Sequence, residues 1–275
     1  MGRSLQSTTT LNNGVPMPIF GLGVWRLAPG EETVRVTAEA LALGYRLIDT
    51  ASGYGNERHV GEALRVSEIP RGDVFITTKL RTEDHGYDST LRAFDDSLAL
   101  LGMDYVDLYL IHWPRSDKRG DSWRAMERIV AGGRARAIGV SNYAERHLTE
   151  LLEHSGVVPA VNQVEFHVFL FQRELLEFCR ARGIQLESYA PLTKGRRLED
   201  SRVAAIASRC RRTIPQVMIR WVIGHDVVAI PKTSRRERLI ENAQAVELEL
   251  TADDMRALDA LDEGYRTTID PDTIP

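Results

Sequence analysis

Four residues near the ends of short apolar runs are of types that together can move a proton. They are Asp49, Tyr54, Lys79 and His112. A lysine that is removed from water needs a carboxylate partner, and Asp49 can serve as one. A cation beside a phenol stabilises the phenolate, so we expect Lys79 to lower the pKa of Tyr54 and to make it a proton donor near neutral pH. His112 would hydrogen-bond a carbonyl oxygen and hold it close to Tyr54.

This group of side chains suits general-acid catalysis of carbonyl reduction. None of the four can donate a hydride, so a cofactor has to supply it. Each residue taken singly also fits a structural role, such as a solvated strand end for Lys79 or a turn residue for His112. The catalytic interpretation therefore rests on the placement of all four at the ends of neighbouring strands.

The elements that would position these residues follow a regular rhythm along the chain. Short apolar runs alternate with segments of helical spacing that end in glycine, and Thr251 and Asp254 fit a capping box at the start of the last helix. Apolar residues at successive positions indicate strands that are covered on both faces. The runs are Phe20–Trp25, Arg46–Thr50, Val74–Leu80, Val106–Trp113, Ala135–Ser141, Val161–Phe166, Ile184–Tyr189 and Val227–Lys232.

The alternation of eight such runs with helices favours an α/β protein with a closed (β/α)8 barrel over an open, doubly wound sheet. We expect residues 1–275 to form one domain of this kind. Before the first run, Thr8–Leu11 and Val15–Pro18 flank an Asn13-Gly14 turn, which predicts a hairpin that caps the bottom of the barrel. An irregular N-terminal arm is the alternative. Catalytic groups of such barrels lie at the C-terminal ends of the strands.

Composition and charge exclude several classes of protein. The chain has 275 residues, of which 43% are hydrophobic and 27% charged, so it can bury a core without disulfides. No apolar stretch is long enough for a membrane span and the polar start lacks a secretory signal, so we expect a cytoplasmic protein. The net charge of −4 gives no reason to expect nucleic acid as a partner. The cysteines and histidines lack the spacing of metal ligands, so no metal is expected.

The sequence offers one weak and one stronger signal for binding a nucleotide. Gly21-Leu-Gly23 begins like a dinucleotide fingerprint, but Arg26 occupies its third glycine position. After the last run, cations and hydroxyls precede or enter a helix that we expect to start at Arg235, and cations at a helix N-terminus form an anion site. The residues concerned are Lys232, Thr233, Ser234 and Arg238.

Several segments resemble the signatures of the aldo-keto reductase family, in the family's order and over nearly the whole chain. They are Asp49–Glu57, Thr78–Leu80, Leu108–Pro114, Gly139–Tyr143, Val161–Glu165 and Ile230–Ser234. The stretch 234–242 is most similar to bacterial 2,5-diketo-gluconate-reductase and prostaglandin-F-synthase members. The resemblance implies an NADPH-dependent, reversible reduction of aldehydes and ketones. In this reaction Tyr54 would donate the proton, and Lys79 and Asp49 would adjust the acidity of Tyr54. His112 would orient the substrate carbonyl.

The resemblance also implies a set of cofactor contacts. Ser141, Asn142 and Gln163 would hydrogen-bond the nicotinamide carboxamide, and Tyr189 would stack on the ring. Lys232, Thr233 and Arg238 would contact the adenosine 2′-phosphate, which predicts NADPH over NADH. The remaining expected contacts are Ala190, Leu192, Ser234, Glu241 and Asn242.

The same resemblance predicts the substrate site. The expected lining is aromatic and consists of Trp25, Tyr54, His112 and Trp113. Such a pocket suits small carbonyl compounds, including diketones and keto acids. Arg81 stands where relatives usually carry tryptophan, and it is either solvated or favours anionic substrates. The short tail after Gly264 predicts an open pocket, and a monomer is expected. The alternative function is a regulatory barrel that binds the cofactor without significant turnover.

Overall fold

Eight parallel strands form a closed barrel in the computed structural model, which describes residues 2–115 and 117–274. The strands are β3 (Leu22–Gly23), β4 (Leu47–Asp49), β5 (Phe75–Leu80), β6 (Val106–Ile111), β7 (Ala135–Ser141), β8 (Val161–Glu165), β9 (Gln185–Tyr189) and β10 (Val228–Ala229). They pair in chain order. The ring closes where Phe20 bridges to Ala229 and the Gly21 N–H donates to the Ala229 carbonyl at 2.9 Å. The predicted (β/α)8 barrel is therefore confirmed.

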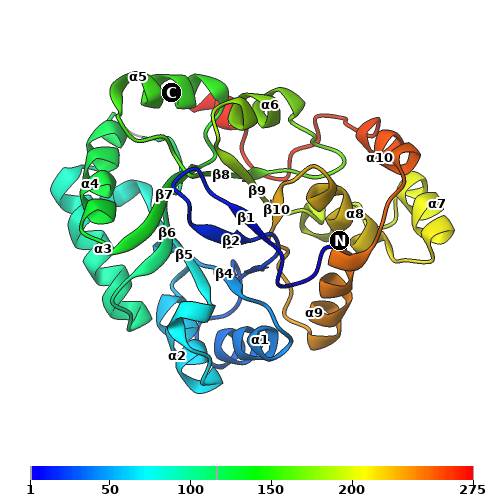
Figure 1. The fold of residues 1–275 in the computed structure, drawn as a ribbon, viewed down its shortest axis with the longest axis horizontal. Coiled ribbons are helices and arrows are strands. Elements are labelled where there is room, and N and C mark those ends of the chain that lie inside the picture. The colour runs from blue at the N-terminus through cyan, green and yellow to red at the C-terminus, as the bar shows by residue number, and fades with distance from the viewer. Residues whose placement is uncertain (1, 116, 275) are drawn as a thin grey trace.

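Helices surround the strands on the outside of the barrel (Figure 1). They are α1 (Glu31–Ala42), α2 (Glu57–Ser67), α3 (Tyr87–Leu101), α4 (Arg119–Ala131), α5 (Glu145–His154), α6 (Arg173–Ala181), α7 (Ser201–Cys210), α8 (Ile214–Gly224), α9 (Arg236–Ala243) and α10 (Ala252–Asp259). Both α7 and α8 lie between β9 and β10. The capping box predicted for α10 is present, because Thr251 Oγ1 accepts from the Asp254 N–H and Asp254 accepts from the Thr251 N–H.

The first and last strands are shorter than the apolar runs that predict them. The runs cover Phe20–Trp25 and Val227–Lys232, but β3 and β10 each have 2 residues. Pro231 has no N–H to donate, so a regular ladder cannot continue through it. The chain still holds the ring closed beyond the strands, since the Gly23 N–H donates to the Pro231 carbonyl at 3.3 Å.

A hairpin of β1 (Thr8–Thr10) and β2 (Pro16–Pro18) crosses the centre of the ring, as the blue ribbon in Figure 1 shows. Its loop is longer than the predicted two-residue turn, because the Leu11 N–H donates to the Val15 carbonyl at 2.9 Å. Asn12, Asn13 and Gly14 therefore form the loop, and Gly14 adopts the left-handed φ of 86° that favours glycine. The hairpin covers the end of the barrel opposite the C-terminal strand ends, as predicted.

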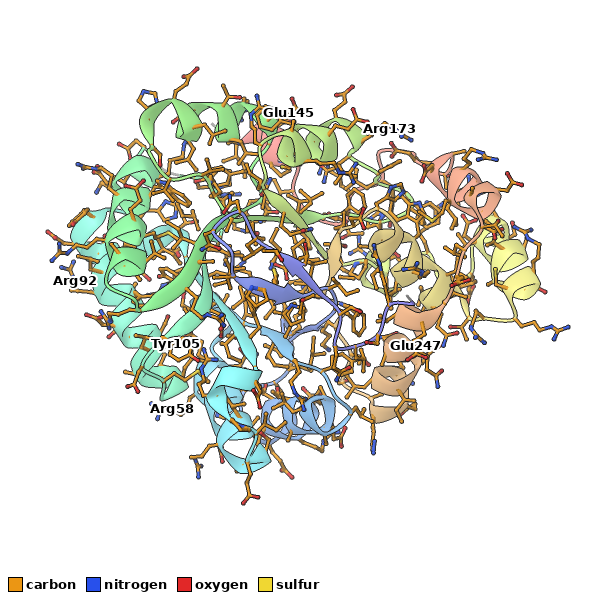
Figure 2. The ribbon with its side chains drawn as sticks, in the orientation of Figure 1. Arg58, Arg92, Tyr105, Glu145, Arg173 and Glu247 are labelled. Carbon is orange, nitrogen blue, oxygen red and sulfur yellow. The ribbon has the colours of Figure 1, made fainter. Side chains whose placement is uncertain are left out.

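Inside the barrel, polar side chains lie above an apolar floor. Residues two apart on a strand share a face, so Asp49 follows Leu47 and Gln163 follows Val161 on the inner side. Leu47 and Val161 belong to one buried apolar cluster with Met17 of the hairpin. Asp49 and Gln163 lie one step nearer the C-terminal strand ends. Figure 2 shows side chains filling the space within the ring, while the labelled Arg92 and Glu145 lie at its periphery.

Candidate active site

The ammonium group of Lys79 is the centre of a buried polar cluster at the C-terminal strand ends. Lys79 is 0% exposed, and its Nζ donates to Asp49 Oδ1 at 2.6 Å and to the Thr50 carbonyl at 2.8 Å. Its third contact is to the Tyr54 hydroxyl at 3.4 Å. An ammonium has three hydrogens, so each has an acceptor. The structure thus brings together residues that are up to 30 positions apart in the chain.

Local backbone structure explains how Tyr54 reaches this cluster. The chain leaves β4 and makes a 3-10 turn over Ser52–Tyr54. The turn is held down because Ser52 Oγ donates to the Lys79 carbonyl at 2.8 Å. The buried side chain of Asn56 also fixes the segment, since it accepts from Thr50 Oγ1 at 2.8 Å and donates to the Val24 carbonyl at 3.0 Å. The phenol is therefore fixed by its own loop and by the two adjacent strands.

Burial changes the electrostatics that the sequence alone predicts. The expected lowering of the Tyr54 pKa is wrong for the protein without ligand, because burial raises this pKa and outweighs the opposing effect of Lys79. Burial alone would lower the pKa of Lys79, but the oxygens of Asp49 and Tyr54 outweigh it, so the pKa is raised. At neutral pH the cluster therefore contains a charged ammonium beside a protonated phenol.

His112 completes the group that the sequence predicts. It follows β6, and its ring makes an edge contact with the Tyr54 ring at 5.6 Å between centroids. Burial and the positive charge of Lys79 lower the pKa of His112 to about 3. The imidazole is therefore neutral at physiological pH and has one N–H to offer.

A cavity of about 780 Å³ opens above this cluster. Every residue expected to contact cofactor or substrate lines it, whereas Lys79 lies beneath. These lining residues are Trp25, Asp49, Tyr54, His112, Trp113, Ser141, Asn142, Gln163, Tyr189, Ala190, Leu192, Lys232, Thr233, Ser234, Arg238, Glu241 and Asn242. The structure thus gathers the candidate residues in one place, while the role of each stays a prediction.

The part of the cavity next to Tyr54 is lined by amide and hydroxyl groups. Asn142 has a left-handed φ of 63°, and its Nδ2 donates to the His112 carbonyl at 2.9 Å. The Tyr189 hydroxyl donates to Asn142 Oδ1 at 2.7 Å, and Ser141 Oγ donates to the Gln163 carbonyl at 2.9 Å. Such groups offer donors and acceptors to a carboxamide.

The other part of the cavity carries positive charge. Lys232, Thr233 and Ser234 follow β10, and Arg238 belongs to α9, whose first residue is Arg236 rather than the expected Arg235. Arg235 instead caps that helix and also lines the cavity. A cavity lined by amides and by cations near a helix N-terminus fits a dinucleotide that carries phosphate groups.

The structure adds residues that sequence reasoning missed. Arg26 and Lys194 line the cavity, and both lie over the Trp25 ring, at 4.4 and 4.9 Å from its centroid. Glu187 is fully buried on β9 and accepts a hydrogen bond from Gln163 Nε2 at 2.8 Å. A charged residue inside the apolar run Ile184–Tyr189 was the available signal for Glu187. Arg26 and Lys194 gave no such signal, because lone surface cations are common.

The C-terminal tail also reaches the cavity. Glu165 at the end of β8 accepts from the backbone N–H groups of Thr267 at 2.7 Å and Thr268 at 3.0 Å. Hydrogen bonds from these residues and from His167 outweigh burial and lower the pKa of Glu165. Thr268 lines the cavity and contacts the Tyr189 hydroxyl at 3.1 Å. The segment after Gly264 therefore contributes to the wall of the cavity rather than leaving that side bare.

Arg81 does not lie at the cavity. Its side chain is 53% exposed and pairs with Asp84 at 2.6 Å. It lines a separate hollow with Glu57 and Arg58. The interpretation of Arg81 as a solvated residue therefore holds, and the structure gives no support for a direct role in selecting anionic substrates.

Within residues 2–115 and 117–274, no group of His, Cys, Asp and Glu side chains is arranged to hold a metal ion. In the same described part of the chain, no helix is both long and apolar enough to cross a membrane.

The closed barrel with its polar cavity at the C-terminal strand ends is typical of an α/β-barrel enzyme. Residues 20–263 match the model of the Aldo/keto reductase family, and the chain belongs to this family. Family membership makes it an NADP(H)-dependent oxidoreductase.

Individual relatives agree with this assignment. The chain is 46% identical over 274 residues to glyoxal reductase of Bacillus subtilis (strain 168), covering 100% of this chain and 99% of that protein. It also resembles the crystal structure of an aldo-keto reductase from a Medee basin deep-sea metagenome library. That match has a TM-score of 0.94 and 41% identity, and covers 98% of this chain and 100% of the other. A mutant of Gox0644 crystallised in complex with NADPH has a TM-score of 0.93 and 42% identity, with 98% and 99% coverage.

Proposed function

We propose that this chain reduces small aldehydes and ketones to alcohols with NADPH, and that Tyr54 donates the proton. The observation that carries the proposal is the contact of the Tyr54 hydroxyl with Lys79 Nζ at 3.4 Å, on the floor of the large cavity. The proposal includes residues 1–275 acting as one domain. The cytoplasmic location and the monomeric state expected from the sequence stay predictions.

The cavity residues divide into two groups that suit the two ends of the cofactor. Ser141, Asn142 and Gln163 would hold the nicotinamide carboxamide, with Tyr189 against the ring. Lys232, Thr233 and Arg238 would hold the 2′-phosphate, while Ser234, Glu241, Asn242, Ala190 and Leu192 would make the remaining contacts. When bound, NADPH would supply the hydride that reduces the carbonyl carbon.

The chain's own residues would handle the proton and the developing negative charge. His112 is neutral, so one ring N–H can donate to the carbonyl oxygen and hold it beside Tyr54. As negative charge develops on that oxygen, the Tyr54 hydroxyl transfers its proton to it. The phenolate left behind is stabilised by the Lys79 ammonium, which Asp49 keeps charged and in place. In the reverse direction the phenolate takes the proton back.

Aromatic side chains suit a small carbonyl substrate. Trp25, Trp113, Tyr54 and His112 line the cavity beside the reacting hydroxyl. The relative from Bacillus subtilis is named a glyoxal reductase. We therefore place aldehydes and α-dicarbonyl compounds first among the candidate substrates, followed by diketones and keto acids.

A spectrophotometric screen tests the proposal. Aldehydes, α-dicarbonyls and keto acids are incubated with the enzyme and NADPH or NADH, and the loss of reduced nicotinamide is followed. We expect turnover that requires a carbonyl compound and is faster with NADPH. Tight NADPH binding without turnover for any of these classes would instead favour the regulatory barrel that the sequence leaves as the alternative.

A further inference from the structure

A second carboxyl group lies beneath the site and has no part in the mechanism above. Glu187 is on β9, directly opposite Gln163 in the pairing of β8 with β9. Its side chain is 0% exposed. A buried carboxyl group is costly to retain, since an apolar side chain of similar size would pack there without losing contact with water. The hydrogen-bond partner of Glu187 therefore indicates the role of this carboxyl group.

That partner is the side-chain amide of Gln163, which bridges two carboxyl groups. Gln163 Nε2 lies 2.8 Å from Asp49 Oδ2 and 2.8 Å from Glu187 Oε2. An amide nitrogen has two hydrogens, so both are donated to these two carboxyl groups below the cavity. Two carboxyl oxygens around one atom also fix which end of the amide faces them, because an amide oxygen there would meet acceptors. Gln163 lines the cavity, so Oε1 is the atom left to meet a ligand.

We propose that Glu187 is a positioning residue of the cofactor site: together with Asp49 it holds both hydrogens of Gln163 Nε2, and so presents Gln163 Oε1 to the nicotinamide carboxamide as an acceptor. This inference rests on the proposed function, in which Gln163 contacts the carboxamide. Glu187 lies outside the set of described residues that line the cavity, so it would position the cofactor through Gln163 rather than by touching it. Without Glu187, one amide hydrogen loses its partner and the amide can turn over.

The charges around Glu187 determine whether its carboxyl group is protonated while it accepts from Gln163. The charges of Lys79 on β5 and Asp49 on β4 shift the pKa of Glu187. Glu187 in turn shifts the pKa of Tyr54. Lys79 is the single cation among them and already pairs with Asp49. Burial and the negative charge of Asp49 raise the pKa of Glu187 to about 8. Glu187 is therefore an uncharged acid at neutral pH, which still accepts from Gln163.

The uncharged form also protects the proton donor. Negative charge on Glu187 would raise the pKa of Tyr54 further and make its hydroxyl a weaker acid. Reduction should accordingly slow as the pH rises through about 8, where Glu187 loses its proton. A role in packing alone would give no such dependence on pH.

A double-mutant cycle with NADPH binding as the readout tests the positioning role. The variants are Glu187→Leu, Glu187→Gln, Gln163→Leu and the double Leu variant, and the measurement is the Kd from quenching of protein fluorescence by NADPH. We expect Glu187→Leu to raise the Kd about tenfold, as for one lost hydrogen bond to a bound group. Glu187→Gln should restore most of the affinity, because its amide oxygen can accept from Gln163. In the Gln163→Leu background, Glu187→Leu should add no further loss.

Glu57→Leu is the matched control, because Glu57 is also a buried glutamate but accepts a hydrogen bond from Thr78 Oγ1, at 2.6 Å, rather than from Gln163. An equal loss of affinity in this control, or an equal effect of Glu187→Leu with and without Gln163, would overturn the proposal. So would unchanged affinity in a Glu187→Leu protein with a native circular dichroism spectrum. Binding is measured without turnover, so an enzyme that binds NADPH but reduces nothing would contradict the proposed function and leave this inference standing.

The pH profile gives a second, independent outcome. Wild-type kcat for reduction should decline above about pH 8, whereas in Glu187→Gln the decline should move to higher pH, where the Tyr54 hydroxyl itself loses its proton. A profile of Glu187→Gln identical to the wild type would overturn the assignment of the uncharged acid.

Discussion

The ammonium nitrogen of Lys79 lies 3.4 Å from the hydroxyl oxygen of Tyr54, although the two residues are 25 positions apart in the chain. The contact is made where β5 ends beside the 3-10 turn that carries Tyr54. It gives the phenol a cation that is already in place before any proton moves, so no rearrangement is needed when the phenolate forms.

Tyr54→Phe should abolish most turnover and preserve the cofactor site. The substitution removes only the hydroxyl, so the ring still packs in the cavity, but the proton donor is gone. We expect kcat for carbonyl reduction to fall by roughly 10²–10⁴-fold, the range typical of general-acid catalysis. NADPH affinity, measured by fluorescence titration, should change little. Substantial retained turnover would refute Tyr54 as the donor.

Arg238→Ala should weaken the preference for NADPH over NADH. Arg238 lines the cation-rich part of the cavity, and a charge-assisted contact to a phosphate contributes about 1.5–3 kcal/mol. We expect the Kd for NADPH to rise at least about tenfold while that for NADH changes little. Arg236→Ala is the control, because Arg236 begins the same helix and is exposed. An unchanged ratio of the two dissociation constants in Arg238→Ala would remove Arg238 from this role.

Arg81→Ala should leave substrate selection unaltered. The guanidinium pairs with Asp84 outside the cavity, and such exposed ion pairs contribute at most about 1 kcal/mol to stability. We expect the ratio of kcat/KM for keto acids to that for neutral carbonyl compounds to match the wild type. A clear loss of activity toward keto acids alone would show that Arg81 reaches the substrate.

Glu187→Gln should stabilise the protein increasingly as the pH rises. Burial raises the folded-state pKa of Glu187 from its ordinary value of 4.5 to about 8. Between these values the folded protein holds a proton that the unfolded chain has released, so wild-type stability falls as the pH rises through this window. The limiting slope is roughly 1 kcal/mol per pH unit. Urea unfolding of both proteins across the window should show a growing difference in the free energy of unfolding, and a constant difference would contradict the assignment.

Much of the fold can be predicted from short stretches of the sequence. Apolar runs alternate with helical segments, and this alternation predicts the order of the strands and helices. Glycines such as Gly102, with its left-handed φ of 65°, mark where helices end. The strand ends are harder to predict. Pro231 ends its strand early because it has no N–H to donate, and the loop from Asn12 to Gly14 is longer than expected because the Leu11 N–H donates to the Val15 carbonyl. That the candidate residues lie together was predictable, because they follow strands whose C-terminal ends share one rim, while their roles stay predictions.

The sequence by itself determined the order of strands and helices, the family, and the residue types that gather at the rim of the barrel. Those properties depend on spacing along the chain and on motifs a few residues long. The tertiary structure alone decided the raised pKa of Tyr54, the place of Arg81 outside the cavity, and the bridge from Asp49 through Gln163 to Glu187. These depend on burial and on contacts between residues as far as 114 positions apart, which only the closed barrel brings together.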